Sequence, residues 1–177
     1  MNDLIGQFLT SAEEGDLTKL EHLYSANPEL LKSQDKDGYT ALHRAAYNDM
    51  SEVCNWLLMK GADPQIRTND GWTALHCAAC WANYEIVAIL LRHGVDVNSK
   101  IVPLHLAINC SSDDKQKQYL TVKYLLEAPG FHFLKLIFIV KYSGVEMNAV
   151  NGAGDSILDL AKRTRSDLLE LLKSHMK

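Results

Sequence analysis

Apolar residues recur through most of the chain at the spacing of short amphipathic helices. Leu42 and Ala45 fall on one helical face, and Val53 and Leu57 fall on one face of a second helix after a short polar break. Steps of three and four residues between apolar positions are typical of helices that bury one side. The pattern predicts pairs of short helices that are joined to one another by polar turns.

This helical pattern repeats with a period of 33 residues. The segment DGYTALHRAA at 37–46 returns as DGWTALHCAA at 70–79, and LLMKGAD at 57–63 returns as LLRHGVD at 90–96. Weaker copies are PLHLA at 103–107 and GDSILDLA at 154–161. Such a period indicates a stack of units, none of which can bury its apolar face alone.

The repeated segments resemble the ankyrin-repeat family, in which a Gly-x-Thr-Pro-Leu-His-x-Ala-Ala pattern recurs at this period. The resemblance covers nearly the whole chain and implies an all-α solenoid of stacked helix–turn–helix units with short hairpin fingers. We expect one domain over residues 1–177 with about five helix pairs. The expected repeats are 4–35 as an N-terminal cap, 36–68, 69–98, 99–148 with insertions at 111–118 and 128–142, and 149–177 as a C-terminal cap.

Local chemistry supports these units independently. Gly38 stands where a tight turn requires a positive φ, and Thr40 precedes a helix whose free backbone N–H groups it can cap. The glycine that the family places between the two helices of a repeat is replaced by Asp49 and by Ala82. Because alanine tolerates the left-handed region poorly, we expect strain or a rearranged turn at Ala82.

Three departures from the period affect the third full repeat. Its finger is shortened, because the step from Asp96 to Leu104 spans 8 residues against 12 one repeat earlier. Two complete fingers remain, centred on 36–39 and 69–72. A polar insertion, Ser111–Gln118, separates its two helices, and we expect a solvated loop there.

The third departure is the apolar run Phe131–Val140, which lies within the extra residues 128–142. Three interpretations remain open: an extension of the preceding helix, a sticky patch for a partner, or an insertion peculiar to this version of the chain. We favour a helix extension or a local hydrophobic cluster, with Pro129-Gly130 as a break before the run. The run is too short to span a membrane.

The composition of the chain excludes several functions, although it says little about the fold. The net charge of −4 and the isoelectric point near 5.9 disfavour direct binding to nucleic acid or to an anionic membrane. We expect no secretory signal and no membrane-spanning segment. Four cysteines are too sparse for a disulfide scaffold, so we expect an intracellular monomer of the cytoplasm, the nucleus or both.

Two patterns suggest enzymatic or metal chemistry, and both have a stronger structural interpretation. His43, His76 and His105 recur in register, and the resemblance implies that this histidine hydrogen-bonds the preceding threonine and nearby backbone. Cys77 and Cys80 have the spacing of half a zinc site, but the other cysteines supply no second pair. We therefore expect no catalytic residue, no metal and no cofactor.

Aromatic residues mark the candidate binding surface. The resemblance implies that the slot after the turn glycine, which holds Tyr39 and Trp72, faces a concave groove. Tyr47 and Trp81 fall after the first helix, at other variable positions that line this groove. Tyr and Trp dominate interface hot spots, so we expect at least two of the four to bind a partner. The candidate partner-binding residues are Asp37, Tyr39, Tyr47, Asp70, Trp72 and Trp81.

The sequence thus predicts a non-catalytic protein–protein interaction module, or adaptor, that binds another protein through its concave groove and hairpin fingers. The alternative is a nuclear regulator of transcription that acts through protein contacts. An enzyme would need a converging nucleophile and base, which no spacing in this chain suggests. The identity of the partner does not follow from the fold.

Overall fold

The computed structural model describes residues 2–97, 103–108, 110, 113–128 and 166–175, and in these the chain forms helices and no strand. The all-α prediction is therefore confirmed. The helices are α1 (Asn2–Glu14), α2 (Leu17–Ala26), the 3-10 helix η1 (Pro28–Lys32), α3 (Ala41–Tyr47), α4 (Ser51–Met59), α5 (Ala74–Cys80), α6 (Tyr84–Arg92), α7 (Pro103–Ile108), α8 (Lys115–Glu127) and α11 (Ser166–His175).

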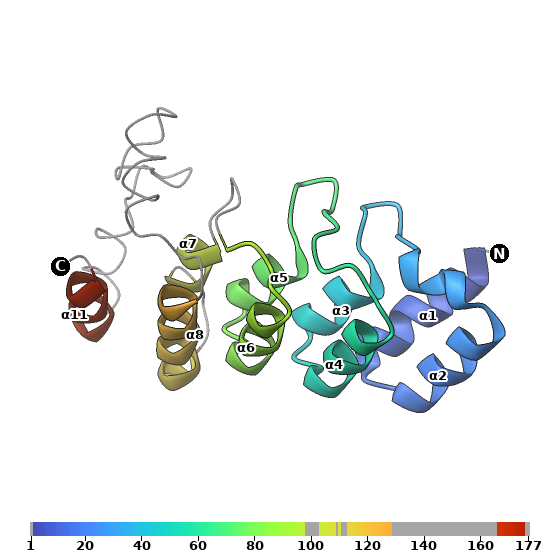
Figure 1. Cartoon of the computed structure of the whole chain (residues 1–177), viewed down its shortest axis with the longest axis horizontal. Coiled ribbons are helices and arrows are strands. Elements are labelled where there is room, and N and C mark those ends of the chain that lie inside the picture. The colour runs from blue at the N-terminus through green and yellow to red at the C-terminus, as the bar shows by residue number, and fades with distance from the viewer. Residues whose placement is uncertain (1, 98–102, 109, 111–112, 129–165, 176–177) are drawn as a thin grey trace.

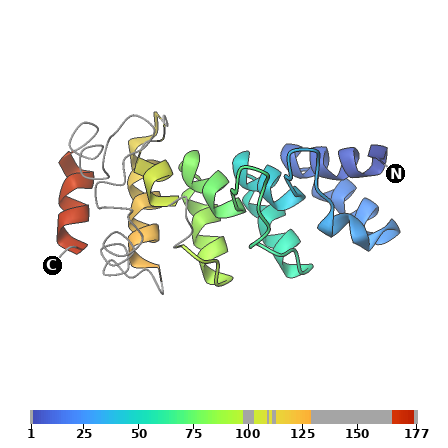
Figure 2. The same cartoon turned by 90° about the horizontal axis from the view of Figure 1, so that it is seen from above.

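Helices alternate between two rows that run the length of the stack (Figures 1 and 2). An inner row contains α1, α3, α5 and α7, and an outer row contains α2, α4, α6 and α8. Each inner helix packs against the next inner helix and against the outer helix that follows it in the chain. The first finger (33–40) and the second finger (66–73) project from the inner row, and α11 packs on α8 at the far end.

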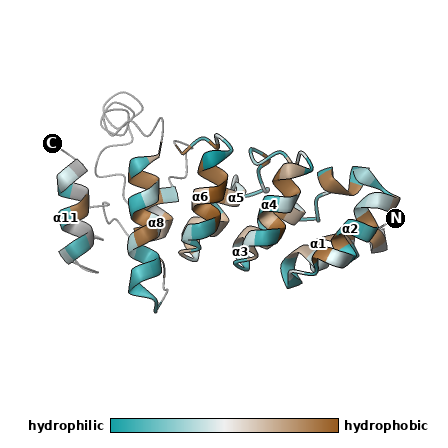
Figure 3. Cartoon of the chain, turned by 60° about the horizontal axis from the view of Figure 1, so that its bottom comes forward, coloured by the Kyte–Doolittle hydropathy of each residue, from teal (hydrophilic) through white to brown (hydrophobic). Residues whose placement is uncertain are grey.

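The core lies between the two rows. Leu42 and Leu75 from the inner row, and Leu57 and Leu90 from the outer row, are fully or almost fully buried. Alanines on the inner helices let neighbouring repeats approach closely, and Ala45, Ala46, Ala78 and Ala79 are fully buried. Figure 3 shows apolar and polar residues on different sides of the outer helices α2, α4, α6 and α8, as expected for helices with one buried side.

The turns between inner and outer helices keep the left-handed backbone that a glycine would adopt, so of the two outcomes expected at Ala82 the structure shows strain and not a rearranged turn. Asp49 has a φ of 61° and Ala82 a φ of 58°. Ala82 is also fully buried, so its methyl group fills space in the core while its backbone lies in an unfavourable region.

The insertion at 111–118 differs from the prediction. Helix α8 begins at Lys115 and has 13 residues, against 9 in α4 and in α6. Asp114 caps it, and the Gln118 side chain is buried, where its Nε2 donates to the carbonyl oxygen of Ile108 at 2.9 Å. The expectation of a loop is wrong for 115–118, because these residues form the start of α8, and Gln118 among them donates to the carbonyl groups at the end of α7.

Helix α8 ends at Glu127, and Ala128 follows in an extended conformation with φ −61° and ψ 137°. Pro129 accounts for this, since a proline disfavours helical backbone in the residue before it. Helix α8 thus ends where the sequence predicted a break before the apolar run. The run at 131–140, the shortened finger at 99–102 and the weak repeat copy at 154–161 lie outside the described residues.

Candidate protein-binding surface

We call the exposed face of the inner row, together with the two fingers, the inner surface. Each finger closes with a backbone hydrogen bond across four residues. The N–H of Asp35 donates to the carbonyl of Tyr39 at 3.0 Å, and the N–H of Thr68 donates to the carbonyl of Trp72 at 2.8 Å. The two fingers therefore present Tyr39 and Trp72 in equivalent positions.

The fingers also contact one another. The backbone N–H of Asn69 donates to the carbonyl of Asp37 at 3.0 Å, and the Asn69 side chain donates to the carbonyl of Lys36 at 3.0 Å. Gly38 lies at this contact with a φ of +86°, and a Cβ atom there would lie 2.9 Å from the backbone nitrogen of Asn69. Glycine at 38 thus permits both the turn and the close approach of the second finger.

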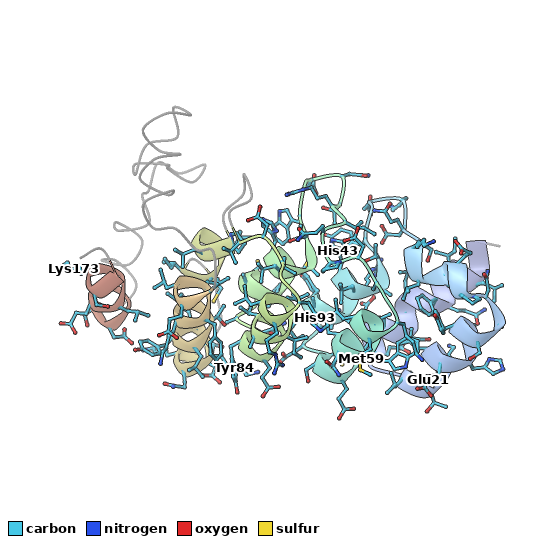
Figure 4. The ribbon with its side chains drawn as sticks, viewed as in Figure 1. Glu21, His43, Met59, Tyr84, His93 and Lys173 are labelled. Atoms are coloured by element: carbon cyan, nitrogen blue, oxygen red, sulfur yellow. The ribbon has the colours of Figure 1, made fainter. Side chains whose placement is uncertain are left out.

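Buried histidines attach the fingers to the inner helices. The N–H of Thr40 donates to Nδ1 of His43 at 3.2 Å, so Nε2 of the neutral ring carries the proton and donates to the carbonyl of Trp72 at 3.1 Å. Burial lowers the pKa of His43, although the hydrogen bond to Trp72 opposes this shift. Figure 4 shows His43 between α3 and the fingers.

The same threonine–histidine contact recurs one repeat later, where the N–H of Thr73 donates to Nδ1 of His76 at 3.0 Å. The structural interpretation of the recurring histidines is thus confirmed for His43 and His76. The side chain of His105 lies outside the described part of the chain.

Tyr47 and Trp81 form an exposed aromatic pair across two repeats. Tyr47 is the last residue of α3, and Trp81 caps the C-terminal end of α5. Their ring centroids lie 5.0 Å apart with an interplanar angle of 66°, and the residues are 41% and 43% exposed. The sequence analysis placed both residues at positions that line the groove, and the structure adds that the two rings touch.

Tyr39 and Trp72 are more enclosed than this pair. Both are half-buried and pack against core residues. The Tyr39 ring centroid lies 5.7 Å from that of His43, and the Trp72 ring centroid lies 6.4 Å from that of His76. These two aromatics therefore serve the packing of the fingers as well as the inner surface, while Asp37 and Asp70 are exposed on the fingers.

The sequence analysis missed a charged cluster on this surface. Nη1 of Arg44 lies 2.6 Å from Oε2 of Glu13, and Nη2 lies 2.7 Å from Oδ2 of Asp35. The Arg44 guanidinium carbon also lies 6.0 Å from the centroid of the Tyr39 ring. Burial acts to raise the pKa of Asp35, but hydrogen bonds from Arg44 and from two backbone N–H groups outweigh it and lower the pKa.

No local signal marked this cluster, because Arg44 aligns with Cys77 and Leu106 at an ordinary variable position and its partner Glu13 lies 31 residues away. Only the stacking of α3 on α1 brings Arg44 and Glu13 together.

A family model described as ankyrin repeats in three copies matches residues 8–101 of the chain. The chain belongs to the ankyrin-repeat family. Ankyrin repeats generally mediate protein–protein interactions. The predicted family is confirmed, and the fingers, the capping threonines and the two-row stack described above are the structural form of these repeats.

Several known proteins share part of this ankyrin-repeat sequence. Ankyrin repeat domain-containing protein 49 is 42% identical over 55 residues in Bos taurus and 38% identical over 55 residues in Homo sapiens, which covers 31% of this chain and 23% of each relative. The NAD-capped RNA hydrolase NUDT12 of Homo sapiens is 42% identical over 64 residues, covering 36% of this chain. The match spans only 14% of the hydrolase, so the likeness concerns a small part of that protein.

The thiols, the possible metal ligands and the helix lengths in the described part of the ankyrin stack also bear on its chemistry. Cys77 is buried, and burial raises the pKa of its thiol to about 12, while Cys80 is half-buried. Among the described residues, no group of three His, Cys, Asp or Glu side chains could hold a metal ion. None of the described helices has the length and apolar character that crossing a membrane requires.

The described residues also form a hollow on the outer row, between α6 and α8. Tyr84 and Tyr124 line it with stacked rings whose centroids lie 6.3 Å apart, and Leu91 and Ala128 contribute apolar surface. None of the six predicted partner-binding residues lines this hollow. The hollow is therefore separate from the inner surface.

Proposed function

We propose that this ankyrin-repeat domain is a non-catalytic adaptor that binds another protein through its inner surface. The observation that carries the proposal is the Tyr47–Trp81 pair, two large aromatic side chains that touch across adjacent repeats and remain more than 40% exposed. The half-buried thiol of Cys80, which is in no disulfide, supports an intracellular location, where cysteines stay reduced. The proposed contact residues are Asp37, Tyr39, Tyr47, Asp70, Trp72 and Trp81.

The position of the pair suits binding. Tyr47 and Trp81 stand at helix ends that the stack holds in place, so little conformational freedom is lost when a partner covers them. The Asn83 side chain adds rigidity, because its Nδ2 donates to the carbonyl of Ala46 at 2.9 Å and so joins the repeat at 69–98 to the repeat at 36–68. Rigid aromatic side chains with both an apolar body and a polar atom are common at interface hot spots.

The test compares tryptophans on the two rows. The wild-type chain, Trp81→Ala and Trp56→Ala are each immobilised, and proteins bound from a cell extract are identified and then measured as purified partners. Trp56 is the matched control, since it lies on outer helix α4 and contacts Tyr24 with ring centroids 5.5 Å apart. We expect Trp81→Ala to weaken binding of the partner by about 30-fold, as truncation of a hot-spot aromatic does.

Trp56→Ala should lower stability through lost packing but leave the affinity of the folded protein unchanged. Circular dichroism of each variant separates unfolding from loss of binding. A partner that Trp56→Ala releases and Trp81→Ala retains would contradict the proposed surface.

A further inference from the structure

We infer that the partner covers Tyr47 and Trp81 with a proline-rich segment in the polyproline II conformation. This inference rests on the proposed function, because it names the chemistry of what the same surface binds. It depends on which hydrogen-bonding groups around the aromatic pair are used within the chain and which are left for a partner.

The aromatic pair offers two hydrogen-bond donors to a partner. The indole N–H of Trp81 can only donate, and the hydroxyl of Tyr47 can donate as well as accept. None of the hydrogen bonds found among the described residues uses either group, whereas Nε1 of Trp56 on the outer row donates to Oε1 of Glu21 at 3.1 Å. A partner that covers the pair must therefore supply acceptors, because two donors that lose water without replacement cost binding free energy.

The carbonyl groups beside the pair are used within the chain. Those of the last four residues of α3 all accept hydrogen bonds, from the side chain of Asn48, from the backbone N–H of Met50 and from the side chain of Asn83. Nδ2 of Asn83 alone lies 2.9 Å from the carbonyl oxygen of Ala46 and 3.3 Å from that of Tyr47. Backbone N–H groups of a partner that faced this end of α3 would therefore meet carbonyls that already have donors.

Charged groups near the pair do not change this balance. Asp49 is the carboxylate closest to the pair in the sequence, and its Oδ2 lies 2.9 Å from Nζ of Lys117. Helix α5, which ends at Trp81, contains no Asp, Glu, Lys or Arg. The surface around the pair thus favours an uncharged segment that carries acceptors and few donors.

A proline-rich segment has this chemistry. Proline has no backbone N–H, and the polyproline II helix makes no internal hydrogen bonds, so its carbonyl groups are free to accept. Proline-rich segments dock into grooves lined by aromatic rings, and the Tyr47 and Trp81 rings stand at 66° to one another with both residues exposed. Because the segment is stiff before it binds, little conformational entropy is lost.

Other modes of peptide recognition fit this surface less well. A partner strand needs a free sheet edge, and the described residues form no strand. An amphipathic helix needs a row of apolar anchor sites along a groove. Tyr39 and Trp72, the other aromatic residues of the inner surface, are half-buried and pack against the core, so the exposed anchor is the single pair.

The experiment selects binders from a displayed library of random peptides on the full chain. We expect proline to be enriched in the recovered peptides relative to the unselected library. These peptides are synthesised, and their affinities are measured by fluorescence anisotropy. Exchange of an enriched proline for alanine restores an N–H group and loosens the segment, so it should weaken binding about fivefold.

Trp81→Phe tests the donor separately from the ring. It keeps an aromatic side chain but removes the indole N–H, so binding of the recovered peptides should weaken about fivefold. Trp56→Phe is the matched control, because it makes the same exchange on outer helix α4, and it should leave the affinity unchanged. Circular dichroism shows whether each variant is folded.

The outcomes separate this inference from the proposed function. Peptides that lack proline and yet lose affinity with Trp81→Ala would overturn the inference and leave the proposed function standing. The same holds if the alanine-substituted peptides, or the Trp81→Phe variant, bind with unchanged affinity, or if the selection recovers no peptide. Recovered peptides that bind equally to the wild type and to Trp81→Ala would contradict both.

Discussion

At the scale of single residues, His43 illustrates how a buried polar group is accommodated in this fold. Its neutral ring accepts from the N–H of Thr40 at Nδ1 and donates to the carbonyl of Trp72 at Nε2, so both ring nitrogens are satisfied without a charge. Protonation would place a second N–H at Nδ1, which would break the hydrogen bond from the Thr40 N–H and leave Oγ1 of Thr40, 2.8 Å away, as the acceptor. The histidine therefore holds the first finger, α3 and the second finger together while it stays uncharged.

This arrangement predicts that stability depends on pH through His43. The pKa of His43 is lowered by burial, so between that pKa and the unfolded value of about 6.5 the unfolded chain binds more protons. The stabilisation is fully present above about pH 6.5 and is lost as pH falls toward the folded pKa. Urea unfolding at about pH 7.5 and at about pH 5.5 should show a larger loss in the wild type than in His43→Gln.

His43→Gln should itself be less stable at neutral pH, because Thr40 and Trp72 lose hydrogen-bond partners. Equal losses in the two proteins on acidification would show that another group causes the pH dependence.

At the scale of elements, the two fingers need glycine at position 38 for two reasons. The backbone has a positive φ there, and the second finger leaves no room for a Cβ atom. Gly38 and Gly61 have similar positive φ values, 86° and 91°, but a Cβ at 38 would press on the backbone of Asn69 while a Cβ at 61 would meet nothing within 4 Å. The two positions thus separate the conformational cost of a side chain from its steric cost.

We predict that Gly38→Ala destabilises the domain more than Gly61→Ala. The left-handed region costs alanine about 1–2 kcal/mol at either position, and at 38 the displacement of the second finger adds to this cost. Chemical denaturation measures both variants, and amide shifts of Asn69 should change in Gly38→Ala only. Similar losses in the two variants would mean that the fingers adjust freely to one another.

At the scale of the whole molecule, contacts run mainly between neighbouring repeats, and one ion pair reaches further. Nζ of Lys117, in α8, lies 2.9 Å from Oδ2 of Asp49, in the turn between α3 and α4, although 68 residues separate them. The intervening turn holds Ala82, whose side chain is short. The four-residue lengthening of α8 relative to α6 thus brings Lys117 within reach of a repeat that is not its neighbour.

We predict a small coupling between Asp49 and Lys117. A double-mutant cycle with Asp49→Asn and Lys117→Met should give about 0.2–1 kcal/mol, because both side chains are roughly 40% exposed, and the coupling should decrease at high salt. Lys123→Met is the matched control, since Lys123 is a lysine of the same helix that lies outside this ion pair. A coupling that is absent at low salt, or as large for Lys123, would show that the ion pair does not join the repeats.

The sequence by itself determined the features that depend on interactions between residues close together in the chain. The 33-residue period, the helix pairs and the capping threonines follow from periodicity and from local turn chemistry, whereas the choice between strain and a rearranged turn at Ala82 did not. The period can be read by comparing the sequence with itself, and the other features each depend on a few consecutive residues. The candidate aromatics were found in the same way, because their slots are fixed by the repeat register.

Tertiary structure alone decided the contacts between repeats. The Arg44 cluster, the Tyr47–Trp81 pair and the Lys117–Asp49 ion pair join residues 31, 34 and 68 positions apart. The burial of Gln118, which turned an expected loop into helix, likewise depends on carbonyl groups at the end of α7. Such contacts depend on the distance between stacked helices and on the positions that long side chains can reach. The apolar pattern of one repeat determines neither of them.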